Sequence, residues 1–138
     1  ANSKCLRVCV MEKPNLVLLV DDDEISNFIN ETILKGNLKN TEIHSFIDPH
    51  EALTFLKNTF DQNPKPTLLF LDINMPQMNG WEVLDQLQEI KEIHNFLKVI
   101  MISSSIDNTD KKKSRENSLV VDFISKPLSN SYIQNLIS

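Results

Sequence analysis

Near the middle of the chain stands LDINMPQMNGWE, residues 71–82. The apolar run TLLFLD, residues 67–72, ends in Asp72, and a Met75-Pro76 step and an Asn79-Gly80 turn precede an amphipathic segment. Pro and Gly at such places interrupt regular structure. The pattern therefore predicts a carboxylate displayed at the end of a buried strand, and Asp72 is the first candidate site residue.

Three other apolar runs also end in polar side chains. LVLLV is followed by Asp21, Asp22 and Asp23, LKVIMIS ends in Ser103, and VVDFISKP ends in Lys126-Pro127. In an open parallel sheet, ligands bind beyond the carboxyl ends of the strands. One crevice can therefore hold acids, a hydroxyl and an amine.

Five short apolar runs alternate with segments of helical period along the chain. This alternation predicts a parallel sheet with crossover helices. The expected strands are residues 16–20, 42–47, 67–71, 98–102 and 120–124. The expected helices are residues 24–37, a helix from Asp48-Pro49, a helix from near Gly80 with Trp81 capping its start, a polar helix near 107–117 and a helix after Ser129.

The segment 24–37 carries apolar residues at spacings of three and four, which is typical of a helix with one buried side. We expect this side to pack on the sheet. Its members are Ile25, Phe28, Ile29, Ile33 and Leu34. Asp23 is expected to be an N-terminal charge on this helix, where acids are favoured.

Composition narrows the class of protein. The chain has 138 residues, of which 41% are hydrophobic and 24% charged, and its formal net charge is −5. These values fit one globular domain and argue against binding to nucleic acid, which needs clustered positive charge. No apolar run approaches the roughly 20 residues of a membrane span. Cys5 and Cys9 suggest no disulfide framework, and a reducing cytoplasm fits them best. We expect residues 1–14 to be a leader or added segment and residues 15–138 to be the domain.

Taken together, the residues at the four strand ends resemble the receiver domain of bacterial two-component response regulators, and in particular the single-domain, chemotaxis-regulator-like kind. The resemblance covers residues 15–137. It implies an α/β fold of flavodoxin-like (βα)5 type, a doubly wound sandwich whose five-stranded parallel sheet has the order 2-1-3-4-5. It also implies a phosphorylation switch that catalyses only its own phosphorylation and dephosphorylation, and no other enzymatic activity.

The resemblance also assigns roles to the candidate site residues. Asp72 would accept a phosphoryl group, and Lys126 and Ser103 would contact that group. Mg²⁺, with Mn²⁺ as a substitute, would be bound by Asp21, Asp22, Asp72 and the backbone carbonyl of Asn74. Ser103 and Phe123 would form the switch, and Asn74 and Ser105 would border the path of the attacking water. Lys126-Pro127 is expected to be a cis peptide.

The implied partners are a histidine kinase or histidine phosphotransfer protein as phosphodonor, and a downstream protein as target. The target, or a second copy in a phosphorylation-dependent homodimer, would bind the surface made by the helix near 107–117, the strand 120–124 and the helix after Ser129. The basic residues between Lys111 and Arg115 lie in this region. Nucleic acid and membrane partners are not expected.

Two other functions remain open from the residues. A magnesium-dependent phosphohydrolase would need an acid two residues after Asp72, where this chain has Asn74. A phosphate-independent pseudo-receiver or a flavin-binding relative is the other alternative. One departure from the family pattern is the lack of a glycine before the last strand, where we expect Asn117 to adopt the left-handed conformation instead.

Overall fold

The computed structural model describes residues 12–105 and 107–137, and in these ranges five parallel strands form one sheet in the order β2-β1-β3-β4-β5. The strands are β1 (Leu16–Val20), β2 (Glu42–Phe46), β3 (Thr67–Asp72), β4 (Leu97–Ser103) and β5 (Val120–Ser125). The predicted order is confirmed, and each predicted strand agrees with the observed one to within a residue at either end.

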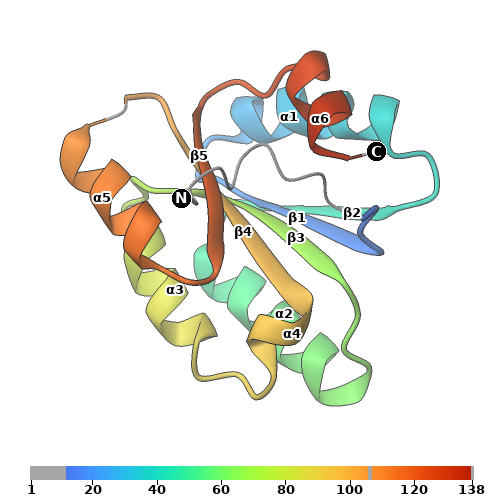
Figure 1. Ribbon diagram of the computed structural model, residues 1–138, viewed down its shortest axis with the longest axis vertical. Helices are drawn as coiled ribbons and strands as arrows, with labels where there is room; N and C mark the ends of the chain where they lie inside the picture. The colour runs from blue at the N-terminus through green and yellow to red at the C-terminus, as the bar shows by residue number, and fades with distance from the viewer. Residues whose placement is uncertain (1–11, 106, 138) are drawn as a thin grey trace.

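Helices cover both faces of this sheet, as Figure 1 shows: α1 and α6 lie on one face and the other helices on the opposite face. The helices in the described residues are α1 (Glu24–Asn37), α2 (Pro49–Gln62), α3 (Gly80–Leu87), α4 (Ile93–Phe96), α5 (Asn108–Glu116) and α6 (Asn130–Leu136). The single turn α4 was not predicted. Because α4 is counted, the helix expected near 107–117 is labelled α5, and the helix expected after Ser129 is labelled α6.

The sheet is buried on both faces, so alternate residues of each strand feed two separate cores. Leu18 and Leu69 face the core shared with α2 and α3, whereas Leu19 and Phe70 face the core shared with α1 and α6. Every residue of β1 and β3 is buried. The near-continuous apolar character of these runs follows from this burial.

All five strands are parallel, so their carboxyl ends lie along one edge of the sheet. Gly80 lets α3 begin close to this edge: its N–H donates to the carbonyl of Ile73 at 2.8 Å, and a Cβ at Gly80 would lie 2.7 Å from the carbonyl oxygen of Asp72. Any other residue at position 80 would displace the Asp72 loop. The Asn-Gly step therefore serves close approach of the backbone.

The expectation for the apolar stripe of α1 was wrong for three of its five residues. Ile25, Phe28 and Ile29 are 70%, 73% and 42% exposed, and only Leu34 is fully buried. Asn27 and Asn30 lie on the buried side instead. Their amide groups bond to backbone atoms around the carboxyl edge of the sheet, so this edge meets α1 through polar contacts.

Several helix ends follow the sequence signals, and two differ. Asp48 caps α2 and Pro49 is its first residue, as expected. The cap of α3 is Asn79, in a capping box with Glu82, so Trp81 is not the cap. Asn117 has φ −98° rather than a left-handed conformation, because its side-chain oxygen accepts a hydrogen bond from the N–H of Leu119 at 3.0 Å and closes the turn locally.

The predicted segment 1–14 falls mostly outside the described residues, and so do Cys5 and Cys9. Among the helices that the structure describes, none combines the length and the apolar character that crossing a bilayer requires.

Candidate functional site

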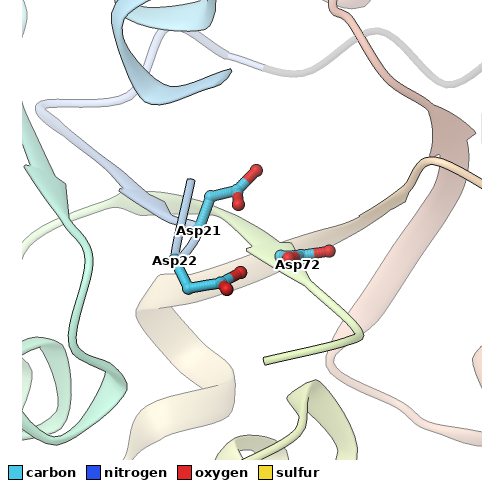
Figure 2. A group of neighbouring side chains, drawn as sticks. All are labelled: Asp21, Asp22 and Asp72. Carbon is cyan, nitrogen blue, oxygen red and sulfur yellow. The ribbon is translucent and has the colours of Figure 1, made fainter. Parts of the chain in front are cut away.

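Three carboxylates meet at the carboxyl edge of the sheet. Asp21 and Asp22 follow β1, Asp72 ends β3, and an oxygen of each lies within 4.8 Å of the others. Figure 2 shows the three side chains pointing to the same side of the strand ends. Asp21 and Asp72 are buried, whereas Asp22 is exposed. The site therefore has two buried acids and one that faces solvent.

The turn after β1 fixes the direction of Asp21. Its Oδ1 accepts a hydrogen bond from the N–H of Asp23 at 3.0 Å, and its own N–H donates to the carbonyl of Phe46 at 3.1 Å. Asp23 points away to the start of α1, where it accepts from the N–H of Ile25 at 3.0 Å. This bond lowers the pKa of Asp23. The expected role of Asp23 as an N-terminal charge on α1 is confirmed.

Lys126 brings the positive charge. Its Nζ lies 2.7 Å from Oδ2 of Asp21 and 3.5 Å from Oδ1 of Asp72. Burial favours the neutral amine, but the ion pairs with Asp21 and Asp72 outweigh burial and raise the pKa of Lys126. The Lys126-Pro127 peptide is cis, as expected.

The surroundings of Asp72 perturb its ionisation strongly. Burial first, and the charge of Asp21 second, raise its pKa to about 7, although Lys126 and the N–H of Asn74 act in the opposite direction. Three carboxylates thus face one ammonium, and the negative charge is only partly balanced. This excess of negative charge favours a bound cation.

The donor set fits a hard divalent cation. Carboxylate and carbonyl oxygens are the ligands that Mg²⁺ prefers, and Mg²⁺ normally keeps several waters. Asp21, Asp22 and Asp72 supply three such carboxylates. The exposed side of Asp22 leaves room for water beside it.

The remaining predicted site residues differ in their burial and in their hydrogen bonds. Ser103 is buried, and its hydroxyl donates to the carbonyl of Ser105 at 2.6 Å, so it is engaged within its own loop. Asn74 and Ser105 are exposed. Phe123 is half-buried and packs against the core on the α2 and α3 side.

Sequence reasoning missed two residues next to this site. Asn27 donates to the carbonyl of Asp21 at 2.9 Å, and Asn30 accepts from the N–H of Leu128, two residues after Lys126. The signal that could have revealed them is a pair of asparagines three apart inside a helical segment, where Asn is otherwise disfavoured.

The chain belongs to the response regulator receiver domain family, whose model matches residues 17–138. The family, the fold and the acidic cluster identify a receiver domain with a phosphoacceptor role in two-component signalling.

Individual relatives agree with this assignment. The response regulator Rcp1 of Synechocystis is 27% identical over 93 residues, which are 66% of this chain and 63% of Rcp1. The sensor histidine kinase CheAY of Helicobacter pylori is 27% identical over 88% of this chain, but only 14% of that kinase is covered. A solved two-component response regulator from Cytophaga hutchinsonii is 35% identical, with a TM-score of 0.82 over 91% of this chain and 95% of that chain. This chain thus spans less than two thirds of the length of Rcp1 and of CheAY.

Proposed function

We propose that the carboxylate of Asp72 accepts a phosphoryl group from a phosphohistidine of a histidine kinase or histidine phosphotransfer protein. An oxygen of Asp72 would form a bond to phosphorus while the bond from phosphorus to the imidazole nitrogen breaks, and its electron pair would return to the imidazole. The observation that carries this proposal is the convergence of Asp21, Asp22 and Lys126 on Asp72. Testing phosphorylation of an Asp72→Asn variant is the corresponding experiment.

The proposed Mg²⁺ site, which Mn²⁺ could also occupy, consists of Asp21, Asp22, Asp72 and the carbonyl of Asn74. A bound divalent cation would neutralise the charge that spreads over the phosphoryl oxygens during transfer. The geometry that supports this choice is the cluster of three carboxylates within 4.8 Å. Asp23 is excluded from the set because its side chain caps α1.

Replacing Asp22 with alanine should weaken Mg²⁺ binding at least about tenfold, because a ligand is lost. Replacing Asp23 with alanine should change it much less. The metal-free Asp22→Ala protein should also melt at a higher temperature than the wild type, because one of three mutually repelling carboxylates is gone. Melting curves at increasing Mg²⁺ concentration measure both effects. Equal Mg²⁺ affinities for the two variants would contradict the ligand set.

Lys126 and Ser103 would bind the phosphoryl oxygens. The Lys126 ammonium is a compact charge that can pass from Asp21 and Asp72 to a phosphoryl oxygen. Ser103 would donate a hydrogen bond to the same group. Since its hydroxyl now donates to the carbonyl of Ser105, this bond must break first. Phosphorylation would thereby release the loop that follows β4.

The exposed apolar residues of α1 support a protein as the phosphodonor. Ile25, Phe28 and Ile29 lie on the first two turns of α1, directly after Asp21 and Asp22, and Ile47 follows β2. Ile47 is 46% exposed. We call these four residues the α1 patch. Because the patch and Asp72 share the carboxyl edge of the sheet, a protein that buries the patch can bring its phosphohistidine to Asp72.

The surface formed by α5, β5 and α6 would report the phosphorylation state to a downstream protein or a second copy. α5 follows the Ser103 loop and is joined to α3 by Trp81, whose Nε1 donates to Asp110 at 3.1 Å. Lys113 lies over the same ring, 5.6 Å from its centroid. Release of the Ser103 loop would move α5 relative to Trp81, and Phe123 would turn into the space that Ser103 vacates.

Trp81, the only tryptophan of the chain, provides a measurement of this switch. Beryllofluoride with Mg²⁺, a mimic of the phosphoryl group, should change the emission of Trp81 in the wild type because its contacts with α5 change. In Ser103→Ala the protein should still bind beryllofluoride, but most of the emission change should be lost. An unchanged response in Ser103→Ala would show that Ser103 does not couple Asp72 to α5.

Residues 15–138 would form the receiver domain and residues 1–14 a separate leader or added segment. The protein would lie in the cytoplasm, because histidine kinases and phosphotransfer proteins present their phosphohistidines there. Fractionation of cells that express the native gene tests the location.

A further inference from the structure

Two buried asparagines, Asn27 and Asn30, lie three residues apart on the inward side of α1. The amide nitrogen of Asn27 donates to the carbonyls of Asp21 at 2.9 Å and Phe46 at 3.1 Å. The side-chain oxygen of Asn30 accepts from the N–H of Leu128 at 3.0 Å. One helix therefore contacts the ends of β1 and β2 and also the segment that follows β5.

The contact with Leu128 matters because of where Lys126 stands in the sheet. β5 is an edge strand, and β3 and β4 separate it from β1. The N–H of Lys126 donates to the carbonyl of Ser103 at 2.9 Å, Pro127 has no N–H, and the next N–H is that of Leu128. The backbone around Lys126 is thus held by β4 on one side and by Asn30 on the other.

We infer that Asn30 is a positioning residue for Lys126: by accepting the hydrogen bond of the buried Leu128 N–H, it sets where the Lys126 ammonium lies relative to Asp21 and Asp72. The inference rests on the proposed phosphotransfer role of Lys126. Without Asn30 the Leu128 N–H would be buried without an acceptor, and the loop would have to move to find one. The ammonium, now 2.7 Å from Asp21 and 3.5 Å from Asp72, would move with it.

The test variant is Asn30→Leu, which keeps the number and branching of the side-chain heavy atoms and removes the acceptor. The matched control is Asn37→Ala, because Asn37 also joins α1 to the chain that follows β5, through an exposed hydrogen bond of 2.9 Å to Asn130 of α6. Phosphorylation rates are measured against acetyl phosphate concentration at saturating Mg²⁺. In Asn30→Leu the maximal rate should fall about tenfold, as expected for a misplaced charge, while Mg²⁺ affinity changes less than about twofold. Asn37→Ala should behave as the wild type.

Combining the substitutions separates positioning from general loss of structure. If Asn30 acts through Lys126, adding Asn30→Leu to Lys126→Ala should slow the reaction no further. Asn30→Gln, which retains an amide oxygen, should recover part of the rate. If melting curves show that Asn30→Leu is not folded, Asn30→Ala, which also lacks an acceptor, takes its place in the same comparisons.

A wild-type maximal rate in the folded Asn30 variant overturns the inference, and so does an equal further loss in the Lys126→Ala background. Failure of the proposed function has a different signature. A wild-type protein that acetyl phosphate does not modify overturns that function and the inference with it, whereas a Lys126→Ala variant with the wild-type rate overturns the role of Lys126 and the inference.

Discussion

Asp72→Asn protein should carry no phosphoryl group under conditions that fully modify the wild type. The amide of asparagine is a poor nucleophile, and Asp72 ends β3, which lies between β1 with its two acids and β4 with Ser103 at its end. Intact-protein mass spectrometry after incubation with acetyl phosphate and Mg²⁺ measures the effect. We expect the mass increase of one phosphoryl group in the wild type and none in the variant.

The matched control for this experiment is Asp23→Asn. Asp23 is the third acid after β1, but it is exposed and caps α1. Asparagine caps a helix about as well as aspartate, so this substitution should keep the cap and leave phosphorylation intact. Phosphate retained by folded Asp72→Asn protein would mean that another residue is the acceptor. Loss of phosphorylation in Asp23→Asn would mean that the acidic run acts as a whole.

Phe28→Asp should abolish most phosphotransfer from a protein donor while leaving modification by acetyl phosphate unchanged. Phe28 is 73% exposed, so the substitution removes no core contact. In a complex, however, an exposed aromatic at the centre of an apolar patch is a typical hot spot, worth at least about 2 kcal/mol or roughly thirtyfold in affinity. A charge at the same position must also be desolvated when the donor binds.

The donors to be screened are autophosphorylated histidine kinases, and phosphotransfer proteins that these kinases have phosphorylated, from the organism that carries this chain. The donor that modifies the wild type fastest is then used for the comparison. Radiolabel transfer at donor concentrations below saturation reports the loss of affinity. Gln86→Asp, an exposed change on α3 at the opposite face of the sheet, is the control and should transfer normally. If Phe28→Asp accepts phosphate from the donor at the wild-type rate, the α1 patch does not bind the donor.

The α1 patch also shows what the sequence could not predict. A stripe with helical period indicates that one side of α1 is apolar, but a core-facing and a partner-facing stripe have the same period. Leu34 is buried, whereas Phe28, six residues or about 1.7 turns earlier, lies on a different side of the same helix and is exposed. Phe28 is exposed because Asn27 and Asn30 occupy the buried side of α1 near the strand ends. These asparagines bond to the carbonyl of Phe46 and the N–H of Leu128, which are far away in sequence.

The strand ends were predictable for the opposite reason. In a parallel sheet each strand is a continuous apolar run, so the first polar residue after it marks the carboxyl edge directly. Asp21, Asp72 and Ser103 were located in this way, and Lys126 follows one residue after Ser125. The structure brings the carboxylates of Asp21 and Asp72 to the ammonium of Lys126. The engagement of the Ser103 hydroxyl with Ser105 was not predictable, because it depends on the conformation of one loop.

The proposed function makes Asp72 the phosphoacceptor of a cation-dependent reaction. The most direct test is to locate the phosphoryl group in wild-type protein that has been incubated with acetyl phosphate, either with Mg²⁺ or with EDTA. Borohydride converts a phosphorylated aspartate to homoserine, which tandem mass spectrometry then locates in the sequence. We predict homoserine at position 72 alone, and only in the sample with Mg²⁺. Homoserine at position 21 or 22 instead, or equal conversion in EDTA, would contradict the account.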